Sequence, residues 1–194
     1  MKSLYRFIVE PSINRYDNIR KINETELIIN TSIEDHKFVS KKAVVVSTPA
    51  AYASKIKKGD EVYVHHNVFR RYYDMKGIEK NSSTFFKDDM YFVSPEQIYM
   101  YNLKPHLDYC FVKPLHETND LINKKEKEHF GILKYSNKSL ERVGLNPGAL
   151  VVFTPYSEFE FIIEGERLYC MKSNDIVLTH EHEGNEKEYN PSWA

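Results

Sequence analysis

An internal repeat is the feature of this sequence that most restricts its fold. Residues 43–47 (AVVVS) align with residues 132–136 (ILKYS), and Gly59 falls on Gly148 at the same offset of 89 positions. Chance explains one matching apolar segment more easily than several in one order with the same turn glycine. The sequence therefore predicts two copies of one supersecondary structure, in the same order of strands along the chain.

The repeated segments have the character of short β-strands. They are rich in β-branched and aromatic residues, which favour strands, and Gly, Pro, Asn or Asp bounds most of them. In the first half they cover residues 4–10, 43–46, 61–65, 89–93 and 97–101. We predict an all-β chain of two tandem, partly open β-barrels.

The repeat also predicts the domain boundaries. The first barrel covers residues 1–104 and the second covers residues 105–180. The polar residues 181–194 form a tail that we expect to be loosely ordered apart from Trp193.

The amino-acid composition argues against several classes of function. The 194 residues carry 27 basic and 28 acidic side chains, so the chain lacks the basic character of a general nucleic-acid binder. Two cysteines cannot build a disulfide framework and favour a reducing compartment. No apolar stretch reaches the roughly 20 residues that span a bilayer. We expect a cytoplasmic protein without a membrane partner.

Each half carries a polar insert after its first strand. Residues 12–42 contain the apolar triplet Leu27, Ile28 and Ile29, and the shorter residues 115–130 contain Leu121 and Ile122. Long inserts in compact domains are usually functional. These apolar residues either dock on a partner or pin the insert to its own barrel.

Three segments resemble the GroES-type co-chaperonin family. Residues 160–166 (EFIIEGE) and 171–177 (MKSNDIV) match two of its motifs in order and spacing, and residues 56–63 (IKKGDEVY) match its turn-and-strand motif. The resemblance spans most of both halves. It implies a GroES-like, partly open β-barrel in each half and a mobile loop between the first two strands.

In that family the loop carries an apolar tripeptide that docks on the apical domains of a chaperonin. The resemblance assigns this partner-binding role to Leu27, Ile28, Ile29, Leu121 and Ile122. It also implies a homo-oligomeric ring, no cofactor and no enzymatic activity, since ATP hydrolysis belongs to the partner. Divergent phage forms of the family exist, and we expect the chain in the cytoplasm of a bacterium or a phage-infected host.

Three departures from the family pattern bear on this assignment. Thr25 and Glu26 stand where the family loop is glycine-rich, and residues 49–55 and 137–144 are short for the hairpin that roofs the family's dome. Two barrels in one chain also leave the ring symmetry open.

Two other functions follow from other features. A tandem barrel suits a structural or assembly protein of a virus-like particle. The run Arg70, Arg71, Tyr72 and Tyr73 suits stacking of single-stranded nucleic acid, although a solvated hairpin with exposed arginines is the simpler explanation.

Candidate chemical groups are few. His65 and His66 are adjacent on an expected strand and would point to opposite faces, which disfavours a shared metal. His180 and His182 would share a face but lack further ligands. Cys110 is expected in the core. We predict no metal site and no catalytic residues.

Overall fold

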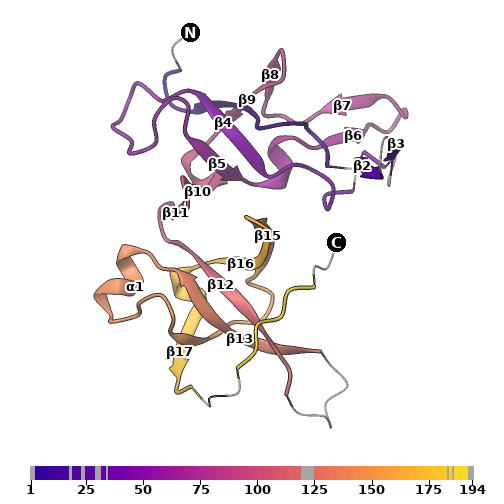
Figure 1. The fold of residues 1–194 in the computed structure, drawn as a ribbon. Helices are drawn as coiled ribbons and strands as arrows, with labels where there is room; N and C mark the ends of the chain where they lie inside the picture. The colour runs from indigo at the N-terminus through magenta and orange to yellow at the C-terminus, as the bar shows by residue number, and fades with distance from the viewer. Residues whose placement is uncertain are drawn as a thin grey trace. The chain divides into compact units, whose positions relative to one another are not determined.

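Strands dominate the chain in the computed structural model (Figure 1). The structure describes residues 3–17, 19–22, 25–28, 32–33, 35–118, 125–182, 184 and 186–191, with side chains left out at 20–22 and 25–27. Within these residues the only α-helix is the short α1 (Lys138–Arg142). The all-β class is confirmed, whereas the assignment to GroES-like barrels stays a prediction.

The chain divides into two compact units between Leu103 and Lys104. The first unit contains β1 (Phe7–Pro11), β2 (Ile19–Ile22), β3 (Thr25–Ile28), β4 (Lys42–Ser47), β5 (Glu61–Val64), η1 (His66–Val68), β6 (Arg71–Tyr73), β7 (Glu79–Asn81), β8 (Phe85–Lys87), β9 (Met90–Val93), η2 (Pro95–Gln97) and β10 (Ile98–Tyr101). The two-residue β11 (Lys104–Pro105) follows at the division. The second unit contains β12 (Tyr109–His116), β13 (Glu126–Tyr135), α1, β14 (Leu150–Phe153), β15 (Phe159–Ile163), β16 (Glu166–Lys172), η3 (Ser173–Asp175) and β17 (Ile176–His180).

Both units build their main sheet in the same strand order. Apart from β11 beside β10, the first sheet runs β10-β5-β4-β1-β9-β8. The second runs β17-β14-β13-β12-β16-β15, which is the same plan strand for strand. The repeat in the sequence therefore corresponds to a repeated antiparallel topology.

The register is repeated as well. Val9 of β1 pairs with Val45 of β4, and Val112 of β12 pairs with Leu133 of β13. A bulge precedes Val9 and Val112 in both pairs. Val45 thus corresponds to Leu133, one residue earlier than the gapless alignment places it. The extra residue lies in the connection that contains α1, so the alignment was wrong for this strand.

The shared turn glycines have a backbone reason. Gly59 and Gly148 have φ of +89° and +95°, a region that residues with a Cβ rarely adopt. In this conformation the Gly59 N–H donates to the carbonyl of Val45 at 2.7 Å, and the Gly148 N–H donates to the carbonyl of Leu133 at 2.8 Å. Each glycine closes the turn that leads into β5 or β14.

The two cores also use equivalent positions. Val9, Val45, Val62 and Tyr91 are buried in the first unit. Their counterparts in the second unit are Val112, Leu133, Val151 and Tyr169. Burial of the same strand faces therefore stabilises both copies.

Part of the tail pairs with β12. The His116 N–H donates to the carbonyl of Lys187 at 2.6 Å, and the Tyr189 N–H donates to that of Pro114 at 2.9 Å. This pairing covers Lys113, whose Nζ lies 2.7 Å from Asn190 Oδ1 and 3.5 Å from Glu188 Oε2. A buried ammonium needs such partners, so the tail docks where Lys113 is buried.

Arg167 of β16 is the largest fully buried side chain of the chain's described part. Its Nη1 lies 2.8 Å from Glu126 Oε2, and its Nε lies 2.9 Å from Glu160 Oε2. Its Nη2 donates to the hydroxyl of Tyr169, which in turn donates to Glu126. The network joins β13, β15 and β16 around one cation.

We expect Arg167→Met to destabilise the protein by about 3–5 kcal/mol, because it removes the buried cation that pairs with Glu126 and Glu160. Urea denaturation at neutral pH measures the change. Lys134→Ala is the matched control, since its 3.1 Å pair with Glu166 is exposed and should contribute less than about 1 kcal/mol. Equal losses in the two variants would contradict the importance of the buried network.

Candidate functional site

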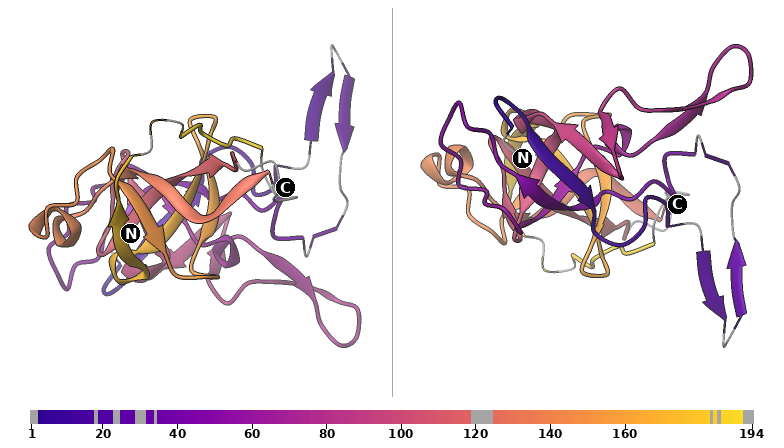
Figure 2. Two further views of the ribbon diagram at one scale, coloured as in Figure 1. Left: turned by 90° about the horizontal axis from the view of Figure 1, so that it is seen from below. Right: turned by 90° about the horizontal axis from the view of Figure 1, so that it is seen from above.

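The insert between β1 and β4 carries a small hairpin, β2–β3. Ile19 pairs with Ile28 in its antiparallel register. Directly opposite residues lie on one face of a hairpin, and these two side chains are 41% and 60% exposed. Figure 2 shows the hairpin projecting from the rest of the first unit. It therefore offers a pair of neighbouring, solvent-exposed isoleucines.

The structure describes only some of the residues that the sequence predicts to dock on a partner. Ile28 is the exposed member of the hairpin pair, and Leu27 lies in β3 opposite Arg20. Ile29 lies outside the described residues, as do Leu121 and Ile122 of the second insert. The structure thus places only part of the predicted set.

Sequence reasoning missed Ile19 as a partner of Ile28. Asn23 and Glu24 separate the two strands in the sequence, and they are not the Asn-Gly or Gly-rich pair that marks two-residue hairpins. The only signal for a hairpin was the presence of strand-like residues on both sides of this dipeptide, and that signal is weak.

Arg15 fixes the base of the insert. Its Nε donates to the carbonyl of Phe69, and its Nη1 lies 2.6 Å from Asn81 Oδ1. Its guanidinium also lies 5.3 Å from the ring centre of the buried Tyr91. One side chain therefore ties the insert to the core and to the β6–β7 hairpin.

Tyr16 makes the second attachment at this base. Its hydroxyl donates to the carbonyl of Ile33 at 2.6 Å and accepts from the Arg71 N–H at 2.8 Å. The guanidinium of Arg71 lies 4.9 Å from the Tyr16 ring centre. Both limbs of the insert and the start of β6 thus meet at one phenol.

The run proposed for nucleic-acid stacking lies at the β6–β7 hairpin. Arg71 Nη1 pairs with Glu79 at 2.8 Å, which neutralises much of its charge. Tyr72 and Tyr73 are 43% and 51% exposed and follow each other on one strand, so they point to opposite faces. The geometry gives this run one neutralised arginine and no shared face for its tyrosines.

Three histidine rings gather where the insert returns to the sheet. The rings of His65 and His66 lie 4.3 Å apart, and those of His36 and His66 lie 5.2 Å apart. The expected strand ends at Val64, and η1 turns the chain, so the prediction that His65 and His66 diverge was wrong. Burial and then neighbouring His65 and His36 lower the pKa of His66 to about 3.

The remaining candidate groups stay apart. Cys110 is buried in the core, as expected, and burial raises the pKa of its thiol to about 12. His180 Nδ1 lies 2.9 Å from the Glu181 carbonyl, whereas His182 Nε2 lies 3.0 Å from that of Gly148. Over the described ranges, no three His, Cys, Asp or Glu side chains are arranged to hold a metal ion.

Comparison with known proteins leaves the family open. No family model matches this chain, and a search of curated proteins finds no match. Among the residues that the structure describes, no helix is long and apolar enough to cross a bilayer.

Tyr16→Phe should destabilise the first unit by about 1–3 kcal/mol, because it leaves the Ile33 carbonyl and the Arg71 N–H without this partner. Urea unfolding and hydrogen exchange at the Arg71 amide measure the effect. Tyr52→Phe is the control, since the Tyr52 hydroxyl is exposed and reaches Tyr5 at only 3.4 Å. Faster exchange at Arg71 in both variants would refute the anchoring role.

Acid should weaken the fold through His66. Its folded pKa of about 3 lies below the ordinary 6.5, so below pH 6.5 the unfolded chain binds a proton that the folded chain does not. Stability should fall as pH drops, by up to about 2 kcal/mol between about pH 7.5 and about pH 5. In His66→Gln this loss should shrink in urea titrations, while the exposed His182→Gln keeps it. An unchanged loss in His66→Gln would contradict the assignment.

Proposed function

We propose that this chain is a co-chaperonin-like protein that binds a chaperonin through the β2–β3 hairpin and assists protein folding without chemistry of its own. The observation that carries the proposal is the exposed Ile19–Ile28 pair on an insert between the first two strands of the repeated plan. The motif resemblance supports it, because that family docks through an apolar segment in the same interval.

The small apolar surface of the hairpin suits weak, reversible binding. Burying one aliphatic side chain contributes about 1.5–3 kcal/mol, so two isoleucines supply only a weak site after ordering costs. Weak binding by one hairpin becomes useful when several copies act together, since linked sites gain avidity without new contacts. A homo-oligomeric ring that presents several hairpins to chaperonin apical domains fits this energetics.

The anchoring at the base suits the same role. Arg15 and Tyr16 hold the root of the insert by partly buried hydrogen bonds, while Ile19 and Ile28 further out stay exposed. A fixed root limits the volume that the hairpin explores and so reduces the entropy lost on docking.

Co-elution with the chaperonin of the source organism or its host tests the proposal. With ADP or ATP present, the wild type should co-elute on size exclusion, and Ile19→Ser/Ile28→Ser should not. The matched control is Met75→Ser/Ile78→Ser, which changes two exposed apolar residues on the other hairpin. It should bind like the wild type.

Each other outcome opposes the proposal. Absence of co-elution by the wild type rules out the co-chaperonin function, and loss only in Met75→Ser/Ile78→Ser moves the contact away from β2–β3. The same column run without chaperonin measures self-association. Large assemblies of this chain that do not bind the chaperonin would instead favour a structural protein of a virus-like particle.

A further inference from the structure

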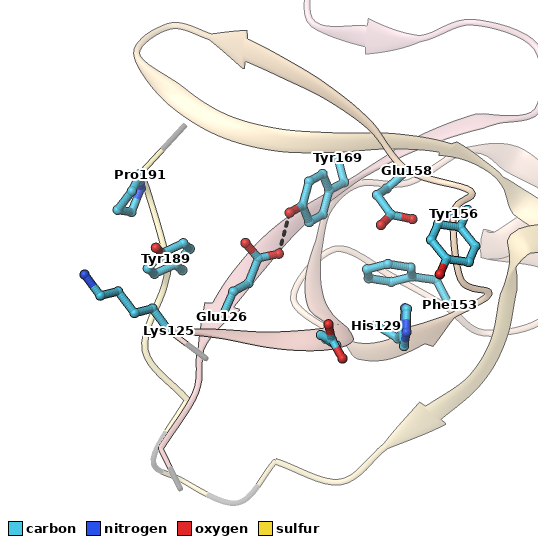
Figure 3. A pocket seen from close by; sticks show the side chains of 10 residues that line it. Lys125, Glu126, His129, Phe153, Tyr156, Glu158, Tyr169, Tyr189 and Pro191 are labelled. Carbon is cyan, nitrogen blue, oxygen red and sulfur yellow. Dashed lines mark hydrogen bonds between the residues drawn. The ribbon is translucent and has the colours of Figure 1, made fainter. Parts of the chain in front are cut away.

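A cavity of about 630 Å³ opens in the second unit, at the end of the sheet where the tail docks. Its walls come from the start of β13, the end of β14, the turn before β15, β16 and the tail, as Figure 3 shows. Cavities of this size hold small molecules. The proposed docking hairpin belongs to the other unit, so this cavity is independent of the proposed function.

Aromatic rings line much of the cavity. They belong to Phe153, Tyr156, Tyr169 and Tyr189, and the ring of His129 stands edge-on to Phe153 with centres 6.0 Å apart. The π-faces of such rings attract organic cations.

The charge of the cavity is negative. Its carboxylates belong to Glu126, Glu128 and Glu158, against one ammonium on Lys125. Glu126 is committed to Arg167 and Tyr169. In Figure 3 the Lys125 side chain points away from Glu158 and Tyr156. The side of the cavity near Glu158 therefore keeps a net negative charge.

Two buried polar atoms on that side lack a hydrogen-bond partner within the described chain. They are Oε2 of Glu158 and Nδ1 of His129. A carboxylate accepts only, and a neutral imidazole nitrogen accepts when the proton is on its other nitrogen. Because unmet buried polar atoms are costly, the Glu158 oxygen favours a ligand that brings N–H donors, and His129 Nδ1 can accept from the same ligand when its proton is on Nε2.

We propose that this cavity binds a small organic cation with N–H donors, of the arylalkyl- or alkylammonium class. Glu158 and His129 receive its N–H groups, Phe153 and Tyr169 contact its carbon skeleton, and the exposed Tyr156 lies at the rim of the site. The volume and the aromatic walls select an organic cation rather than a bare metal ion, and the carboxylates exclude anions.

An NMR titration of the full chain with benzylammonium tests the proposal. We expect saturable shifts at His129 and Tyr169. Benzyl alcohol, which has the same shape without charge, and benzyltrimethylammonium, which has charge without N–H donors, should both bind more weakly. The alcohol tests the need for charge, and the trimethyl compound tests the need for donors.

Three variants locate the contact. Glu158→Gln keeps the shape and removes the charge, so it should raise the Kd for benzylammonium about tenfold. Tyr156→Asn should raise it about threefold by removing one ring. Glu181→Gln, exposed and outside the cavity, should leave it unchanged. A urea midpoint for Glu158→Gln no lower than that of the wild type shows that this variant folds.

Several results would overturn the proposal. They are a lack of saturable shifts, equal binding of benzyl alcohol, equal binding of benzyltrimethylammonium, or a Kd that Glu158→Gln does not change. None of them bears on chaperonin binding, so this site and the proposed function fail separately.

Discussion

A guanidinium stacked on a buried tyrosine organises one end of each unit. Arg15 lies 5.3 Å from the ring centre of Tyr91, and Arg167 lies 4.9 Å from that of Tyr169. The two tyrosines are equivalent, since each is the partner of the valine that follows the bulge in β1 or β12. Arg167 is fully buried and Arg15 is half-buried, and a guanidinium withdrawn from water requires acceptors for its donors, so whatever supplies them is fixed at that end of the sheet.

The two copies meet this requirement with different partners, and their surfaces differ as a result. In the first unit the acceptors include the carbonyls of Phe69 and Arg70, which lock the insert against the segment that leads into β6. In the second unit they are the carboxylates of Glu126 and Glu160. One plan thus roots a projecting hairpin in the first unit and builds an acidic, aromatic cavity in the second.

The sequence predicts the parts of this fold that occur in both repeats. It does not predict the parts whose structure depends on a single long-range contact. The order of the repeated strands along the chain, the turn glycines and the buried Cys110 follow from patterns in the sequence. The β2–β3 hairpin has no turn signature, and the one-residue shift between β4 and β13 is invisible without the pairing. The cavity depends on Tyr169 and the tail residue Tyr189, and nothing local in the sequence indicates that the tail returns to β12.

Buried ion networks seldom stabilise a fold more than apolar residues of similar volume, so stability alone does not explain Arg167 and Lys113. Their requirement for countercharge does restrict alternatives. A shift of β13 by one residue would turn Glu126 away from Arg167, because successive residues of a strand face opposite sides. A displaced tail would likewise remove Asn190 and Glu188 from Lys113. The two cations therefore favour one register of β13 and one path of the tail, and both segments contribute residues to the wall of the cavity.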